Sequence, residues 1–207
     1  LMEVFEGTTE KAPRFCKEFP AAWGTDDIAL KFAGAGGDGA QTAALLVARA
    51  GINEGYDATH IPSYGPESRG GTSYADVHVA RTEVLSPASP APHILVAFNA
   101  PSLARFGPTV VPGGTIIYDS SVIADVPPLA AGVKAFGVPM TRIATELGRP
   151  VVKNVVALGA LQAATGIFPE ETLLTAIRQA LKSKCAMIPL NEEAFTRGGQ
   201  AARNRDS

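Results

Sequence analysis

Hydrophobic and polar positions along the chain change period repeatedly, which predicts strands and helices in alternation. Ile28, Leu30 and Phe32 alternate with smaller or polar residues, as in a strand, and the stretch 40–50 has the Ala, Leu and Val content of a helix. Further strands are predicted at 56–61, 74–79, 93–98, 115–118 and 133–138, and further helices at 101–106, 139–148, 151–165, 169–182 and 191–198. This alternation predicts an α/β fold with a mainly parallel sheet, helices on both of its faces and a helical C-terminal part.

Glycines follow the first predicted strand in the spacing G-x-G-x-x-G. Gly34 permits a tight turn, Gly36 lets a ligand or another backbone approach, and Gly39 lets the helix pack on the strand. Gly37 lies in the same turn. The arrangement is typical of the βαβ unit that opens a Rossmann-like, doubly wound fold. Two interpretations stay open: the turn contacts a ligand, or its glycines only allow close packing.

Carboxylates near this turn do not match a dinucleotide site. Such a site has an Asp or Glu about 20 residues further on, at the end of the second strand. Glu54 comes before the predicted second strand, and Asp57 lies at its start. Asp38 suits the positive end of a helix dipole, but it would repel a bound phosphate. A stand-alone NAD(P)-dependent oxidoreductase is therefore only an alternative hypothesis.

Proline and glycine after the second predicted strand indicate an ordered loop. The loop carries an aromatic ring, a carboxylate, a hydroxyl and a guanidinium before a glycine pair, on Tyr64, Glu67, Ser68, Arg69, Gly70 and Gly71. Loops at the carboxyl ends of parallel strands are where open α/β sheets bind ligands. Arg69 is suited to a carboxylate or phosphate, and the other interpretation is a Glu67–Arg69 pair that only fixes the loop.

Other polar residues give no catalytic centre on this chain. Asn99 follows the predicted strand 93–98 and is a candidate for the same crevice, although a role as helix N-cap is favoured. His60, His78 and His93 lack the spacing of metal ligands, and two cysteines, Cys16 and Cys185, cannot hold an Fe–S cluster. We therefore predict no catalytic residue and no metal site here.

Composition excludes several classes of protein. The chain has 207 residues, 46% of them hydrophobic, and a net charge of −2, so there is no electrostatic case for binding nucleic acid or an anionic membrane. No stretch is long and apolar enough to span a membrane, and no signal sequence opens the chain. With only two cysteines, these features predict a cytoplasmic protein.

The two ends differ from the middle of the chain. Residues 1–26 combine charges of both signs with large apolar residues, so they form either a disordered leader or an arm that packs on a neighbouring subunit. Residues 27–198 form the predicted domain. Residues 199–207 are predicted to be a polar, frayed tail.

Two segments resemble one enzyme family. GAGGDG at 34–39 and PSYGPESRGGTSYADVHVA at 62–80 are similar to the gamma subunit, or gamma domain, of the 2-oxoacid:acceptor oxidoreductases. Members act on pyruvate, 2-oxoglutarate, 2-oxoisovalerate, indolepyruvate or phenylglyoxylate. The block 63–73 carries most of the resemblance, which continues to about Gly198. The family usually has Gln in the place of Asp38, so the function of that Gln does not transfer to this chain.

The resemblance implies a complex in which other subunits carry the principal chemistry. Alpha, beta and ferredoxin-like (delta) subunits would hold thiamine diphosphate, Mg and Fe–S clusters. The complex would convert a 2-oxoacid and CoA to an acyl-CoA and CO2. Electrons would pass to ferredoxin, or to NAD through a further flavin subunit with FAD. The gamma domain would then lie near CoA, with the glycine turn and the Tyr64–Arg69 loop facing a partner. A non-catalytic assembly or ligand-binding module is a third hypothesis.

Overall fold

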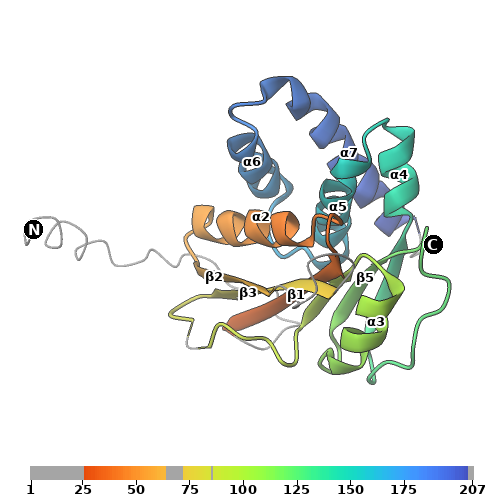
Figure 1. The fold of residues 1–207 in the computed structure, drawn as a ribbon. Helices are drawn as coiled ribbons and strands as arrows, with labels where there is room; N and C mark the ends of the chain where they lie inside the picture. Colours follow the sequence, from red (N-terminus) through yellow and green to blue (C-terminus); the bar gives the residue numbers. More distant parts are fainter. Residues whose placement is uncertain (1–25, 64–71, 85, 205–207) are drawn as a thin grey trace, which may run out of the picture.

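The computed structural model describes residues 26–63, 72–84 and 86–204, and it contains a six-stranded sheet in the order β2-β3-β1-β4-β5-β6 (Figure 1). The strands are β1 (Asp27–Ala35), β2 (Asp57–Ser63), β3 (Thr72–Ala80), β4 (Ile94–Ala97), β5 (Thr115–Asp119) and β6 (Lys134–Val138). β1, β4, β5 and β6 pair in parallel, whereas β3 is antiparallel to both β1 and β2. The prediction of a mainly parallel sheet is confirmed.

Helices cover both faces of the sheet, but unequally (Figure 1). On one side of the sheet lie α2 (Ala40–Asn53), α5 (Lys153–Thr165) and α7 (Ile188–Arg203), and α4 (Met140–Glu146) and α6 (Glu170–Ala180) pack against these helices. The other face packs against α3 (Ala100–Phe106) and the 3₁₀ turn η2 (Gly107–Thr109). Two further 3₁₀ turns are η3 (Pro150–Val152) and η4 (Cys185–Met187). The expected doubly wound architecture with a helical C-terminal part is therefore present.

The second strand is longer than predicted because it lies at the edge of the sheet. β2 continues through Pro62 to Ser63, two residues beyond the predicted end at Ile61. Proline has no N–H to donate, so it is tolerated where one side of a strand is unpaired. Since β2 pairs only with β3, Pro62 lies on an edge strand, where proline is accommodated.

Glycines allow α5 and α7 to pack closely. A Cβ on Gly159 would lie 1.9 Å from the carbonyl oxygen of Phe195, and one on Gly198 would lie 2.0 Å from that of Val156. No side chain fits at such distances, so only glycine permits this crossing. The two helices thereby lie in direct backbone contact on one side of the sheet.

The last helix corrects the prediction for the C-terminus. α7 begins at Ile188 and ends at Arg203, whereas the sequence predicted a helix over 191–198 and a frayed polar tail from residue 199. The helix continues through small buried residues, Gly199 and Ala202, and a Cβ on Gly199 would lie 3.3 Å from the carbonyl oxygen of Gly159 on α5. The prediction of a tail from residue 199 was wrong because these small residues allow the helix to continue its packing.

Some predictions fall on residues outside the described part. These are the N-terminal arm up to residue 25, the loop 64–71 with its six candidate site residues, and residues 205–207. Among the described residues, no helix is long and apolar enough to cross a membrane.

Candidate functional site

The glycine turn joins β1 to α2 at the carboxyl end of β1, and two of its glycines are required by packing. A Cβ on Gly34 would lie 2.8 Å from the Asp38 carboxylate and 3.0 Å from the Cβ of Phe98. A Cβ on Gly39, whose φ is +83°, would lie 2.8 Å from the Cβ of Asn154 on α5. Close packing is therefore sufficient to explain why glycine is needed at these two positions.

The middle of the turn is open instead. No heavy atom lies within 4 Å of a Cβ built on Gly36 or on Gly37, and Gly37 has φ +98°. Both residues are exposed. Backbone here is accessible to another molecule, so the ligand-contact interpretation stays open for Gly36 and Gly37.

Asp38 occupies the place where a helix N-terminus would receive an anion. Its carboxylate accepts a hydrogen bond from the backbone N–H of Ala35 at 2.7 Å and pairs with the ammonium of Lys153 at 2.6 Å. The two paired side chains are only 19% and 14% exposed. An internal carboxylate thus lies just before the N-terminus of α2, and a second anion, such as a pyrophosphate, would have to share this place with it.

The end of β2 also argues against a dinucleotide site. Its last residues, Ile61, Pro62 and Ser63, include no acid that could bind a ribose. The two nearby acids have other roles: Asp57 accepts a hydrogen bond from the backbone N–H of Val84 at 2.8 Å, and Glu54 accepts one from the Thr172 hydroxyl. The geometry therefore disfavours a dinucleotide site of the usual kind.

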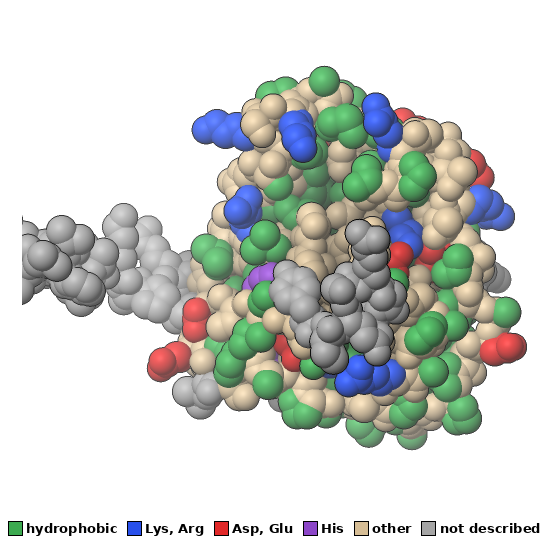
Figure 2. All heavy atoms as spheres, in the orientation of Figure 1, with side chains coloured by type: hydrophobic (Ala, Val, Ile, Leu, Met, Phe, Trp, Pro, Cys, Tyr) green, Lys and Arg blue, Asp and Glu red, His purple; other side chains and the backbone are tan. Residues whose placement is uncertain are grey.

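A cavity of about 540 Å³ opens beside the glycine turn, between α2, η3, α5, α6 and η4. Most of its wall is apolar, and polar groups are added by Gln41, Asn154, Lys184 and Asn191. Figure 2 shows hydrophobic side chains in the hollow of the upper half of this face, with Lys or Arg side chains around it. An apolar cavity of this size with a few polar groups is what small-molecule and cofactor sites have in common. We call it the glycine-turn cavity.

Gln41 is a site residue that the sequence analysis missed. Its amide nitrogen lies 2.8 Å from the carbonyl oxygen of Tyr74, 3.1 Å from the Ser73 hydroxyl and 3.4 Å from the carbonyl oxygen of Ser63. It therefore connects the first turn of α2 to the end of β2 and the start of β3. The amide oxygen of Gln41 is buried and has no hydrogen-bond partner among the residues that the structure describes. A lone Gln in an Ala-rich helix gives no signal in the sequence, because its partners are more than 20 residues away.

Asn99 has the structural role that the sequence favoured. Its side-chain oxygen accepts a hydrogen bond from the backbone N–H of Ser102 at 2.9 Å, so it caps the N-terminus of α3. It does not line the glycine-turn cavity. The structure thus brings Gly37 and Gly39 to the cavity wall and leaves Asn99 away from it.

The histidines lie in or next to strands, and His78 and His93 lie near each other and near Asp27. Burial lowers the pKa of both His60 and His93 from their ordinary values. His93 accepts a hydrogen bond from the backbone N–H of Ala29, which requires a neutral ring. His78 contacts Asp27 and the Ser89 hydroxyl. Within the ranges 26–63, 72–84 and 86–204, no group of His, Cys, Asp or Glu could hold a metal ion.

Residues 29–201 match the model of the pyruvate ferredoxin/flavodoxin oxidoreductase family. The ketoisovalerate oxidoreductase subunit VorA of Methanothermobacter thermautotrophicus is 37% identical over 188 residues, which cover 90% of this chain and 37% of that protein. The 2-oxoglutarate synthase subunit KorC of the same organism is 35% identical over 180 residues, which cover 84% of this chain and 92% of that one.

Solved structures agree with these relatives. The gamma subunit of a keto/oxoacid ferredoxin oxidoreductase from Geobacter sulfurreducens is 29% identical with a TM-score of 0.73, over 86% of this chain and 99% of that one. The 2-oxoglutarate:ferredoxin oxidoreductase from Magnetococcus marinus, solved with 2-oxoglutarate, coenzyme A and succinyl-CoA bound, is 25% identical with a TM-score of 0.79. That match covers 87% of this chain and 32% of the Magnetococcus chain.

The fold and these matches define a subunit of an oxidoreductase. The chain belongs to the pyruvate ferredoxin/flavodoxin oxidoreductase family. Its relatives are subunits of ketoisovalerate oxidoreductase and of 2-oxoglutarate synthase, and the Geobacter neighbour is the gamma subunit of a keto/oxoacid ferredoxin oxidoreductase. It spans a little over a third of the length of the VorA relatives, at 37% of each, and nearly all of the KorC relative, at 92%.

Proposed function

We propose that this chain is the gamma subunit of a multi-subunit 2-oxoacid:acceptor oxidoreductase that depends on thiamine diphosphate and Fe–S clusters. The enzyme oxidatively decarboxylates a 2-oxoacid to an acyl-CoA and CO2. Partner alpha, beta and ferredoxin-like subunits hold thiamine diphosphate, Mg and the clusters. Electrons pass to ferredoxin, or to NAD where a flavin subunit is added. The family match over residues 29–201 carries this proposal.

On this chain the glycine-turn cavity is the proposed contribution to the CoA side of the active site. The Magnetococcus neighbour was solved with coenzyme A bound, so the fold occurs in a CoA-binding enzyme. Here the cavity has an apolar wall for the pantetheine arm, and Lys184 at its edge supplies a positive charge for a phosphate. Gly36 and Gly37 leave room for close approach of backbone to a ligand or a partner. Asp38 directs phosphates away from the turn itself.

The first experiment is an anoxic pull-down of this chain from its native cells, followed by assay of a panel of 2-oxoacids with CoA. We expect larger subunits with thiamine diphosphate and Fe–S clusters to co-purify, and one 2-oxoacid to be turned over. Isolation of the chain alone, with binding of a nicotinamide cofactor, would instead support the stand-alone oxidoreductase.

Two neighbouring lysines test the role of the cavity. Lys184 lines it, whereas Lys182 is equally exposed but lies outside it. In the assembled complex, Lys184→Ala should raise the KM for CoA roughly five- to tenfold, the loss of one charge-assisted phosphate contact, with kcat little changed. Lys182→Ala should leave the KM for CoA unchanged. Equal values for both variants would place CoA elsewhere, and the chain would then be an assembly module.

The loop 64–71 remains part of the proposal from its sequence alone. Arg69 would bind an anionic group or fix the loop near the partner subunit. Arg69→Ala should lower the turnover of the complex without dissociating it. Unchanged kinetics with CoA and the 2-oxoacid would remove the loop from the active site.

A further inference from the structure

A second cavity, of about 440 Å³, lies on the face of the sheet opposite the glycine-turn cavity. Its walls come from β1, β3, the segment 86–92, α3 and η2, and its lining includes Lys31, Tyr74, Asp76, Arg105 and Phe106. Side chains alternate across a strand, so Lys31 points away from the helical face, into which Leu30 and Phe32 are packed. We call this the α3 cavity.

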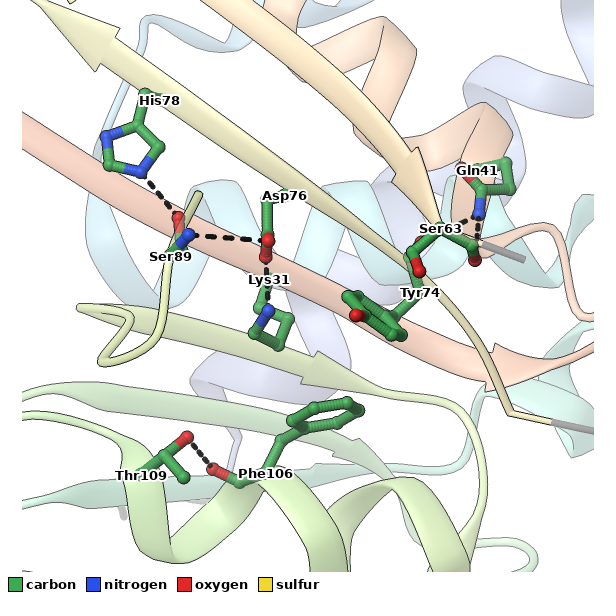
Figure 3. A network of polar contacts seen from close by, with 9 residues as sticks. All are labelled: Lys31, Gln41, Ser63, Tyr74, Asp76, His78, Ser89, Phe106 and Thr109. Carbon is green, nitrogen blue, oxygen red and sulfur yellow. Dashed lines mark hydrogen bonds and ion pairs between the residues drawn. The ribbon is translucent and has the colours of Figure 1, made fainter. Parts of the chain in front are cut away.

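Two charged groups at its base are almost fully buried. Lys31 is 4% exposed and Asp76 is 7% exposed, and the register of β1 and β3 places them directly opposite each other. Their side chains form an ion pair, and the second carboxylate oxygen of Asp76 accepts a hydrogen bond from the backbone N–H of Ser89 at 3.3 Å. Figure 3 shows His78, Ser89, Asp76 and Lys31 in a row along this face. Burying a charge without a partner is costly, so the pair is a built feature of the fold.

Two aromatic rings form the adjacent wall. The Tyr74 and Phe106 rings lie 5.1 Å apart between centroids, and the Lys31 ammonium lies 4.6 Å and 5.0 Å from the two centroids respectively. The Arg105 guanidinium stacks on the same rings, 4.9 Å from the centroid of Phe106 and 5.8 Å from that of Tyr74. The rings hold the guanidinium in place without using its hydrogen-bond donors.

The cavity has more positive than negative charge. Lys31 and Arg105 are cations, and Asp76 is the one carboxylate among the lining residues that the structure describes. Asp76 already pairs with Lys31, and Arg105 forms no ion pair with any residue in the described part of the chain. Arg105 therefore presents unpaired donors beside an apolar, aromatic wall.

From this arrangement we propose that the α3 cavity binds a small organic carboxylate with a flat apolar body. The carboxylate accepts two parallel hydrogen bonds from the Arg105 guanidinium. The apolar body packs against Phe106 and Tyr74. A volume of about 440 Å³ suits such a molecule, since ligand cavities in proteins run from about 300 Å³ upward. The site is separate from the glycine-turn cavity and does not depend on the proposed function.

Benzoate is the probe, titrated into the full 207-residue chain with calorimetry and with NMR of the aromatic ring resonances. We expect saturable binding at roughly millimolar concentration, typical of a fragment of this size, with shifts in the Phe106 and Tyr74 ring signals. Benzamide, which is isosteric but neutral, should not bind measurably. Acetate should bind at least about tenfold more weakly, because it lacks the ring.

Arg105→Gln is the test variant and Arg149→Gln its control, since both arginines are exposed but Arg149 lies outside the cavity. Arg105→Gln should weaken benzoate binding at least about tenfold, and Arg149→Gln should not change it. The proposal is overturned if benzoate does not bind the wild-type chain, if benzamide binds equally well, or if the two variants retain the same affinity. Because Arg105 is exposed, loss of folding is not expected to obscure the result.

Discussion

The two faces of the sheet bury different kinds of residue, although the same strands supply both. Towards the helices, β3 presents Ala75, Val77 and Val79, while towards α3 it presents Tyr74, Asp76 and His78. Five helices lie on the side of the first face, and one short helix, a 3₁₀ turn and a loop cover the second. Where tightly packed helices cover the sheet, the side chains beneath them are apolar and are excluded from water. A face with a thin cover retains charges next to the sheet, provided that they are paired.

The largest expected effect comes from breaking the buried pair. Asp76→Ala leaves the Lys31 ammonium buried without its partner, so the free energy of unfolding should fall by about 3–5 kcal/mol. Urea denaturation measures this free energy of unfolding. Asp125→Ala, which removes an exposed acid, is the control, and its free energy of unfolding should lie within about 0.5 kcal/mol of the wild-type value. The double variant Lys31→Met with Asp76→Leu should recover most of the loss. If Asp76→Ala matches the control, the second face does not depend on its charge pair.

On the helical face, adding one methyl group tests the contact between α5 and α7. Gly198→Ala would place a Cβ 2.0 Å from a backbone oxygen, which no side-chain rotation relieves, so we expect a loss of about 2–3 kcal/mol. Gly36→Ala, with open space around its Cβ, should change the unfolding free energy by less than about 0.5 kcal/mol. Similar stabilities for both variants would show that the two helices can separate at little cost.

A smaller effect is expected at the turn that links the helical face to the candidate site. Asp38→Ala removes the hydrogen bond from Ala35 and the pair with Lys153, and we expect a loss of about 1–2 kcal/mol. Asp26→Ala, whose partner Arg81 is exposed, should cost less than about 1 kcal/mol and less still in high salt. Thermal unfolding at low and high ionic strength distinguishes the two. An Asp38 effect that vanishes in salt would mean that the pair is solvent-exposed.

The smallest effect concerns pH. Burial lowers the pKa of His93, so the unfolded chain binds this proton at a higher pH than the folded chain does. Stability should therefore fall as the pH drops below about 6.5, by up to about 1.4 kcal/mol per pH unit for this group. His93→Gln should flatten that slope, and above about pH 7 its stability curve should run parallel to that of wild type. An unchanged slope in the variant would assign the acid sensitivity to other groups.

Much of the fold could be predicted because it depends on local patterns. The strands at 93–98, 115–118 and 133–138 were read from short apolar runs and lie within one residue of β4, β5 and β6. Asn99 was recognised as a cap because the capping preference acts over three residues. The errors occurred where neighbours across the fold decide: Pro62 was tolerated at a sheet edge, and Gly199 was buried under α5.

The candidate site could be located from the sequence only in part. The glycine spacing indicated the turn correctly, but the two interpretations of its glycines could not be separated without knowing what surrounds each Cβ. Asn154 and Phe98 decide this for Gly39 and Gly34, and both are far away in the sequence. Gln41 and Lys153 could not be recognised from the sequence. Gln41 hydrogen-bonds to the ends of distant strands, and Lys153 pairs with Asp38, which lies 115 positions earlier in the chain.

By itself the sequence determined the alternation of strands and helices, the turn that opens the fold and the family resemblance. These depend on propensity, periodicity and short motifs, which act between near neighbours. Only the tertiary structure decided that β3 inserts antiparallel between β2 and β1, that Asp38 fills the turn's anion position, and that Lys31 faces Asp76 beneath two aromatic rings. The physical reason is that pairing, burial and charge compensation are set by which distant residues the folded chain brings into contact.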